Sequence, residues 1–150
     1  MAIFATTLVG CDSGRIDKLE KQNQEILGQL HQQEAVRIYD LESKCAQEAQ
    51  TYFSDHWRPG KLTAVLNYTN HYNRSLNKCL ILVREQSFMD ENNEWYLGLT
   101  LSDVHERDEF GLFVESHHAT SNSLTRCSVA DTSCTSQQDF ESRIKPYMTN

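Results

Sequence analysis

Apolar residues recur at helical spacing in the first third of the chain, separated by three or four positions, so that they fall on one face of a helix. They are Ile16, Leu19, Ile26, Leu27 and Leu30, with Asn23 on the same stripe, and then Ala35, Ile38, Leu41, Cys45, Ala49, Tyr52 and Phe53. We expect one helix from about Ser13 to about Ser54, which would be about 60 Å long at 1.5 Å per residue. Arg58-Pro59-Gly60 should end it, because Pro restricts the preceding residue and Gly frees the next.

The first part of this helix, residues 12–42, is expected to be a stalk. Its stripe from Ile16 to Leu30 is typical of a short coiled-coil seam. The seam covers only about two heptads, whereas a secure assignment needs three or four. A weak homo-oligomer and a solvated, Gln-rich monomeric helix are therefore the two alternatives.

Beyond Gly60 the apolar period changes to two, which is typical of β-strands. Leu62, Ala64, Leu66 and Tyr68 alternate with more polar positions, and 79–83 is apolar on both sides. Residues 95–101 and 110–115 supply two further strands, joined by acidic turns at 90–94 and 103–109. We expect a four-stranded antiparallel meander.

A second helix is expected to begin near Thr135 or Ser136, where Thr135-x-x-Gln138 fits a capping box. One face of it carries Phe140, Ile144, Tyr147 and Met148. The predicted fold class is therefore α+β, with a long N-terminal helix and a C-terminal helix packed against one side of the sheet. Residues 43–150 should form the folded domain.

Composition fits a folded protein of one ordinary domain. The 150 residues are 39% hydrophobic and 23% charged, and the formal net charge is -7. An acidic surface repels nucleic acid phosphates and anionic lipid, so we expect no nucleic acid partner. The sequence has no run of about 20 apolar residues, so any membrane attachment must come from something other than a spanning helix.

The segment 1–11 ends in Leu8-Val9-Gly10-Cys11 and is followed at once by polar Asp12. This pattern resembles the lipobox of bacterial lipoproteins, where a cysteine thiol carries lipid before a signal peptide is cleaved. It departs from that family in lacking Lys or Arg ahead of the apolar run. We expect 1–11 to be a signal-peptide remnant and Cys11 to be lipid-modified. The alternative is a short buried strand that ends in Gly-Cys.

Cysteine usage agrees with an oxidising periplasm. With Cys11 lipidated, four cysteines remain, which is enough for two disulfides in three alternative pairings. We favour Cys45 with Cys79, which joins a helix to a strand, and Cys127 with Cys134, which encloses a short turn. A reduced cytosolic protein is the alternative, with zinc held by these last two cysteines and by His117 and His118. Cys-x6-Cys is, however, longer than the usual spacing of two to four residues.

The densest polar and aromatic cluster is expected at the turn before the apolar strand. It consists of Asn70, His71, Tyr72, Asn73 and Arg74. Such donors on a rigidly held loop are typical of a ligand-binding site. The alternative is that they satisfy backbone groups in a tight turn, because Asn is a common turn former.

No catalytic signature was found among the motifs of serine hydrolases, phosphate-binding loops or zinc proteases. His105 lies among Asp103, Glu106, Asp108 and Glu109, but these residues lack the alternating ligands and Gly of a Ca²⁺ loop. We interpret them as solvated turn charge. No enzymatic activity, cofactor or metal is expected.

A wider resemblance rests on Cys45-Ala46-Gln47-Glu48-Ala49, on Tyr52-Phe53 and on the run from Asn70 to Cys79. These segments resemble a group of small secreted or lipid-anchored bacterial proteins, and the likeness covers most of residues 45–148. The resemblance implies a similar fold and compartment, with the first two cysteines bridging helix and strand. It implies no chemistry.

These observations predict a non-enzymatic binding or assembly module, anchored in the bacterial periplasm to the inner or outer membrane. The alternative is a secreted, inhibitor-like module that presents 70–77 or 103–109 to a target enzyme. An acidic loop suits a basic target such as a lysozyme. A hydrolase using His71 or His105 is a third hypothesis, supported only by residue types.

Overall fold

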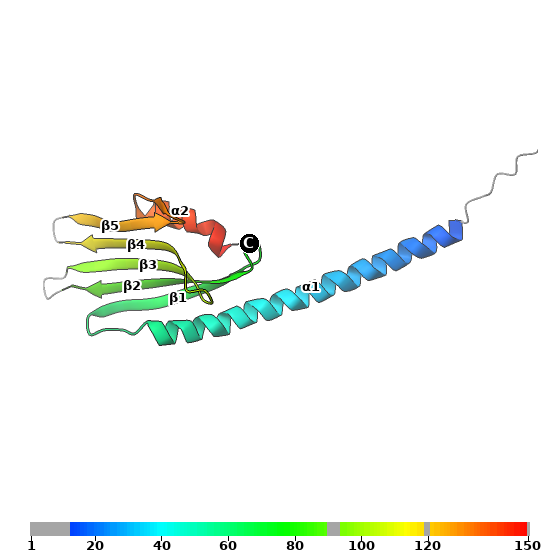
Figure 1. Ribbon diagram of the computed structural model, residues 1–150, viewed down its shortest axis with the longest axis horizontal. Coiled ribbons are helices and arrows are strands. Elements are labelled where there is room, and N and C mark those ends of the chain that lie inside the picture. The colour runs from blue at the N-terminus through cyan, green and yellow to red at the C-terminus, as the bar shows by residue number, and fades with distance from the viewer. Residues whose placement is uncertain (1–12, 90–93, 119–120, 150) are drawn as a thin grey trace, which may run out of the picture. The chain divides into compact units, whose positions relative to one another are not determined.

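The structure is a computed structural model that describes residues 13–89, 94–118 and 121–149. Its helices are α1 (Ser13–His56) and α2 (Gln137–Met148). Its strands are β1 (Thr63–Asn73), β2 (Lys78–Phe88), β3 (Trp95–Asp103), β4 (Glu109–His117), β5 (Asn122–Val129) and β6 (Thr132–Ser133) (Figure 1). The α+β class with helices at both ends is therefore confirmed. The chain divides into two compact units within α1, one up to Tyr39 and the other from Asp40 onward.

The strands form one sheet in the order β1-β2-β3-β4-β5-β6, with every neighbouring pair antiparallel. The four expected strands are present and form a meander, but the predicted count of four is wrong. β5 and β6 were missed because residues 122–126 are all exposed and show no alternation of apolar and polar side chains. Main-chain pairing with β4 keeps β5 in the sheet without help from that pattern.

The tip of the β5–β6 hairpin lies between the two cysteines that were expected to enclose a turn. Ala130 and Asp131 form its two-residue tip with φ of 46° and 63°. Positive φ at both central residues suits the right-handed twist of paired strands, and Gly or Asn usually supplies it. A turn without either residue is hard to identify from sequence.

Helices cover opposite faces of the sheet, so the expectation that both pack on one side is wrong. Cys79, Leu80 and Ile81 are consecutive in β2 and point alternately to the two faces. Cys79 and Ile81 pack in the cluster that contains Ala49 of α1, whereas Leu80 packs in the cluster that contains Phe140 of α2. A strand that is apolar on both sides needs cover on both sides, and the two helices provide it.

Two disulfides form within the second unit, in the pairing that the sequence favoured. Cys45–Cys79 joins α1 to β2, and Cys127–Cys134 closes the β5–β6 hairpin. Such bonds are compatible with an oxidising compartment outside the cytoplasm. Among the described residues, neither helix is both long and apolar enough to cross a membrane.

α2 is capped one residue later than the predicted capping box. The Ser136 side chain accepts a hydrogen bond from the N–H of Asp139, and Asp139 in turn accepts one from the N–H of Thr135. Ser136 and Asp139 therefore form a variant of the box in which the return bond comes from Thr135, and the expected pair of Thr135 with Gln138 is wrong. The shorter Asp side chain serves in place of the Glu or Gln that the motif usually carries.

Candidate binding groove

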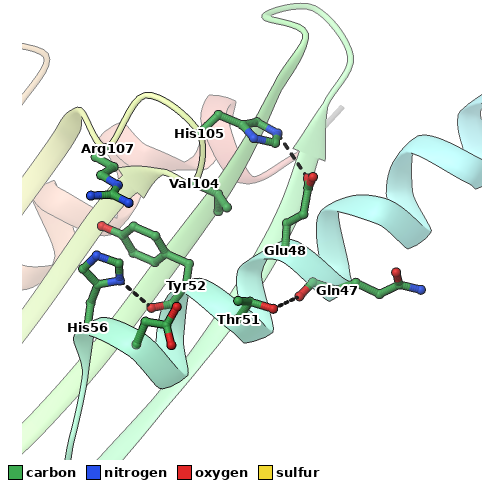
Figure 2. A pocket seen from close by; sticks show the side chains of 9 residues that line it. Gln47, Glu48, Thr51, Tyr52, His56, Val104, His105 and Arg107 are labelled. Atoms are coloured by element: carbon green, nitrogen blue, oxygen red, sulfur yellow. Dashed lines mark hydrogen bonds and ion pairs between the residues drawn. The ribbon is translucent and has the colours of Figure 1, made fainter.

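A groove of about 420 Å³ lies between the C-terminal part of α1 and the turn that joins β3 to β4 (Figure 2). We call it the α1–turn groove. Its helical wall consists of Gln47, Glu48, Thr51, Tyr52, Asp55 and His56, and its other wall consists of Val104, His105 and Arg107. All of these residues belong to the second unit.

Helical periodicity produces the first wall. Cys45 and Ala49 are buried against the sheet. Residues 47, 51 and 55 are spaced four apart and therefore form a row along the helix beside that buried stripe. This row is polar and exposed. The sequence thus builds a polar rim next to an apolar seam.

The second wall is held by a buried carboxylate. Asp103 is only 1% exposed, and its Oδ1 accepts hydrogen bonds from the N–H groups of His105 (2.8 Å) and Glu106 (3.3 Å). Its Oδ2 accepts one from Lys78 Nζ at 2.7 Å, and Lys78 also contacts the Glu106 carboxylate. The N–H of Arg107, whose φ is 62°, donates a hydrogen bond of 3.0 Å to the carbonyl oxygen of Asp103. The turn is therefore fixed before any partner arrives.

Burial opposes ionisation of Asp103 and is the largest influence on its pKa. The hydrogen bonds from Lys78 and from the two backbone N–H groups together outweigh it, so the pKa lies below its usual range. Hydrogen bonds to the carboxylates of Asp103 and Glu106 in turn raise the pKa of Lys78 above its usual value. Both groups are consequently charged across the physiological pH range.

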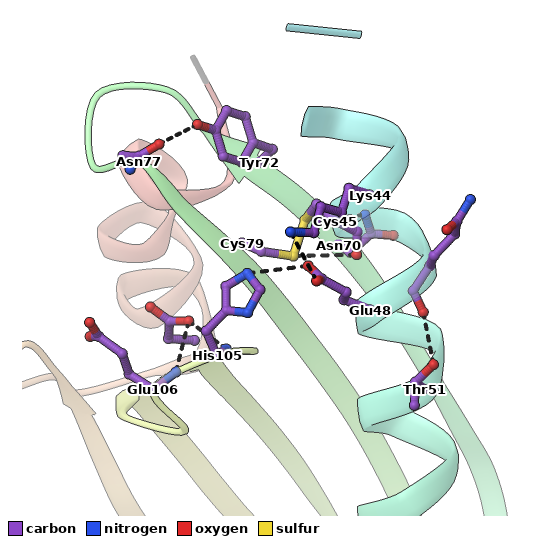
Figure 3. Close-up of polar contacts among 12 residues, drawn as sticks. Lys44, Cys45, Glu48, Thr51, Asn70, Tyr72, Asn77, Cys79, His105 and Glu106 are labelled. Atoms are coloured by element: carbon purple, nitrogen blue, oxygen red, sulfur yellow. Dashed lines mark hydrogen bonds and ion pairs between the residues drawn. A yellow bond between two sulfur atoms is a disulfide. The ribbon is translucent and has the colours of Figure 1, made fainter. Parts of the chain in front are cut away.

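The two walls of the α1–turn groove carry opposite charge. Carboxylates of Glu48 and Asp55 lie on the helix, and His105 and Arg107 lie on the turn. His105 Nε2 is 3.2 Å from Glu48 Oε2, so this pair bridges the walls at one point (Figures 2 and 3). Asp55 and Arg107 are both exposed.

Two polar side chains of the groove contact the backbone of α1 itself. Thr51 contributes the aliphatic hydroxyl in its lining, and that hydroxyl donates to the Gln47 carbonyl at 3.1 Å rather than to a histidine. His56 stacks on Tyr52 with ring centroids 4.4 Å apart, and its Nδ1 lies 2.8 Å from the Tyr52 carbonyl oxygen. These contacts order the surface but align no nucleophile with a base.

The sequence-predicted binding loop is mostly strand. Residues 70–73 belong to β1 and only Arg74 follows it, so the expected extent of the loop is wrong. Asn70 Nδ2 lies 3.9 Å from Cys45 Sγ, and the Tyr72 hydroxyl donates to Asn77 Oδ1 at 2.5 Å (Figure 3). His71 is half-buried in the same strand.

The remaining two residues of that cluster also make structural contacts. Arg74 pairs with Glu42 of α1 at 2.8 Å, and Asn73 is 2% exposed with its amide against the end of α2. The structure therefore brings the cluster together to join β1 to both helices. Ligand binding by this cluster stays a prediction.

Cys127 and Cys134, which the zinc alternative named, are bonded to each other in a disulfide. Their sulfurs are therefore not available to bind zinc together with His117 and His118. His117 stacks on Trp95 at 3.6 Å, and His118 lies 3.1 Å from Glu94. Across residues 13–89, 94–118 and 121–149, no group of three or more His, Cys, Asp or Glu side chains is arranged to hold a metal. Cys11 lies outside the described residues.

The chain matches no protein-family model, no curated protein and no solved structure. Functional assignment therefore rests on the motifs and geometry above. His105 and Arg107 lie in the segment 103–109 that the sequence offered as a loop for a target enzyme, whereas no binding role was expected for Gln47 or Thr51. The row of polar residues four apart beside the Cys45 stripe was the available signal for the helical wall.

Proposed function

We propose that this protein is a bacterial envelope lipoprotein, anchored through Cys11 to the inner or outer membrane. One observation carries this proposal: four of the five cysteines are joined in disulfides, and the fifth stands in Leu8-Val9-Gly10-Cys11. A lipobox cysteine needs a free thiol, whereas disulfides need an oxidising compartment. Both requirements are met by a protein exported to the periplasm.

Metabolic labelling with a fatty-acid probe tests the anchor. The protein expressed with a complete signal sequence should take up label and fractionate with membranes, and Cys11→Ser should do neither. The double substitution Cys127→Ala and Cys134→Ala is the control, because it removes two cysteines without leaving a new free thiol and keeps the lipobox intact. Label that persists in Cys11→Ser would contradict the assignment.

The domain's role in this proposal is to bind another envelope protein without catalysis. The α1–turn groove is preformed, as binding sites commonly are, and its mostly polar lining offers hydrogen bonds to a partner. An extended polypeptide segment suits it, with a basic side chain toward Asp55 and an acidic one toward Arg107. Gln47 and Thr51 would both contact the main chain of this segment.

Site-specific photocrosslinking in the native cell tests the groove. A photoreactive residue at Thr51 should trap one partner, and adding Arg107→Glu should abolish that adduct by reversing a charge. A photoreactive residue at exposed Gln138 of α2 is the matched control and should trap nothing comparable. Equal trapping at the two positions, or none at Thr51, would refute the groove as the binding site.

Inhibition of a foreign enzyme is the second candidate function, and the rigid β3–β4 turn favours it. A loop that is already fixed loses little conformational entropy when it binds, which is how inhibitor loops gain affinity. Asp108 and Glu109 at its exposed end suit a basic target such as a lysozyme. Inhibition that is weakened by Asp108→Lys, but not by Asp55→Lys in the groove, would favour this candidate over the first.

A further inference from the structure

Residues 13–39 of α1, which we call the arm, carry an apolar stripe that the described part of the chain leaves exposed. Ile16, Leu19, Ile26 and Leu30 are 49–59% exposed. Single exposed apolar residues need no explanation, but four on one helical stripe indicate a contact surface. The occupant of that surface can be inferred from the polar residues around it.

The stripe follows heptad positions. Starting with Ile16 at position a, Leu19 falls at d, Asn23 at a, Ile26 at d and Leu30 at a. The seam thus spans residues 16–30 with a polar residue at its centre. A strict alternation of three and four matches another helix of the same kind lying alongside.

Asn23 selects both the partner and the orientation. In a parallel pair of identical helices, a positions face a positions, so the Asn23 amide meets the partner's Asn23 and each satisfies the other. In the usual antiparallel arrangement a faces d, and the amide would lie opposite Leu19 or Ile26 without a partner. An unsatisfied buried amide costs about 1 to 3 kcal/mol, so the parallel pairing is preferred.

Charges beside the seam fit the same arrangement. Arg15 falls at g and Glu20 at the e position of the next heptad, which are the positions that face each other across a parallel coiled coil. They carry opposite charge. Gln22 and Gln29, at the other g positions of the seam, are neutral, so no like charges oppose.

We propose that residues 16–30 of two copies of this chain form a parallel, in-register coiled coil with Asn23 facing the partner's Asn23. This inference goes beyond the proposed function and does not require the lipid. The seam has only five core layers and one of them is polar, so the dimer is weak in dilute solution. Attachment of both copies to one membrane would raise their effective concentration.

Disulfide trapping of the full chain tests the register. The background is Cys11→Ser, which leaves every native cysteine of the chain in a disulfide. Asn23→Cys and Leu30→Cys each place facing thiols across the seam, whereas Lys21→Cys, at outward position f, is the matched control. Both seam variants should form interchain disulfides roughly 100-fold faster than the control, because the coiled coil concentrates their thiols.

Three results would overturn the proposal. Similar rates for Asn23→Cys and Lys21→Cys would mean that the stripe does not face a second copy. Trapping at position 23 without trapping at position 30 would mean an antiparallel pair, because its two position-30 thiols lie at least about 16 Å apart along the helix axis at 1.5 Å per residue. Preferential capture of a different protein by Asn23→Cys in cells would mean that the occupant is not a second copy.

Sedimentation over a wide concentration range provides an independent measurement. Asn23→Leu should strengthen self-association and weaken its preference for two strands, because a buried Asn lowers stability while selecting the oligomeric state. Gln24→Leu, one position outside the seam, is the control. Unchanged association of Asn23→Leu relative to the unmodified chain would contradict the placement of residue 23 in the interface.

Discussion

The side-chain amide of Asn73 joins the end of β1 to the last turn of α2. Its Nδ2 donates hydrogen bonds to the carbonyl oxygens of Pro146 at 3.0 Å and Tyr147 at 3.1 Å, while Oδ1 accepts from the N–H of Leu76 at 3.0 Å. Carbonyls in the last turn of a helix have no partner within it. One buried side chain therefore satisfies two carbonyls at the end of α2 and one N–H group in the turn after β1.

Asn73→Ala should lower the free energy of unfolding by about 2 kcal/mol, because it removes a buried amide that makes three hydrogen bonds, to two carbonyls of α2 and one N–H group. Asn67→Ala, an exposed site on the same strand, is the control and should change it by less than about 0.5 kcal/mol. Denaturant titration with the disulfides intact measures both. Equal effects of the two substitutions would show that the amide contacts contribute nothing specific.

Asn73 also shows how much of a site can be predicted from residue types alone. A cluster of Asn, His, Tyr and Arg is typical both of a ligand site and of polar groups that satisfy a backbone. The sequence could identify the cluster but could not place Pro146, 73 residues later, against it. Only the sheet topology brings β1 and α2 together.

Elements with a strong apolar period were predictable, and elements without one were not. α1 and α2 carry buried side chains at helical spacing and β2 carries a continuous apolar run, so their existence and order follow from the pattern. β5 is exposed over 122–126 and is specified by main-chain pairing with β4, which leaves no mark in the side-chain pattern. The groove was only half predictable, because the turn that carries Arg107 and the part of α1 that carries Thr51 line one groove through tertiary packing alone.

Replacing the cap of α2 should separate the observed capping box from the expected one. Ser136→Ala should cost about 1 kcal/mol, since it removes the acceptor for the Asp139 N–H. Gln138→Ala should be close to neutral or slightly stabilising, because Ala is the better helix former. Thermal unfolding of the two variants decides between the boxes. A larger loss for Gln138→Ala would contradict the cap at Ser136.

The two disulfides should contribute unequally to stability. Their sequence separations are 34 and 7 residues, and the entropy that a bridge removes from the unfolded chain grows with loop length. Removing the bond between Cys45 and Cys79 should cost about 4 kcal/mol, and removing that between Cys127 and Cys134 about 2 kcal/mol. Paired Cys→Ala variants compared in denaturant measure the difference.

Redox dependence is the control for that comparison. The cost of Cys79→Ala relative to the unmodified chain should be large under oxidising conditions and small under reducing ones, where both chains lack the bond. Non-reducing peptide mapping checks the pairing itself. A peptide joining Cys45 to Cys127 would refute the connectivity on which the prediction depends.

Asp103 and Lys78 should make stability depend on pH with opposite signs at the two extremes. The pKa of Asp103 is lowered in the fold, so its contribution is present above about pH 4 and is lost as pH falls through the folded-state pKa. The pKa of Lys78 is raised, so its contribution is present below about pH 10 and is lost as pH rises through the folded-state pKa. Between these limits the pair should contribute a constant amount.

Asp103→Asn isolates the acid limb of this dependence. Near neutral pH the substitution should lower the free energy of unfolding by about 3 kcal/mol. It removes the buried negative charge that lies 2.7 Å from Lys78 Nζ. The difference between variant and unmodified chain should shrink as pH falls below about 4, because the carboxyl of the unfolded chain binds a proton there, and it should be lost once pH passes the lower folded-state pKa. Asp108→Asn, on the exposed part of the same turn, should show no such convergence. Denaturant titrations across the acid range measure all three proteins, and a pH-independent gap would mean that Asp103 stabilises the turn through shape rather than charge.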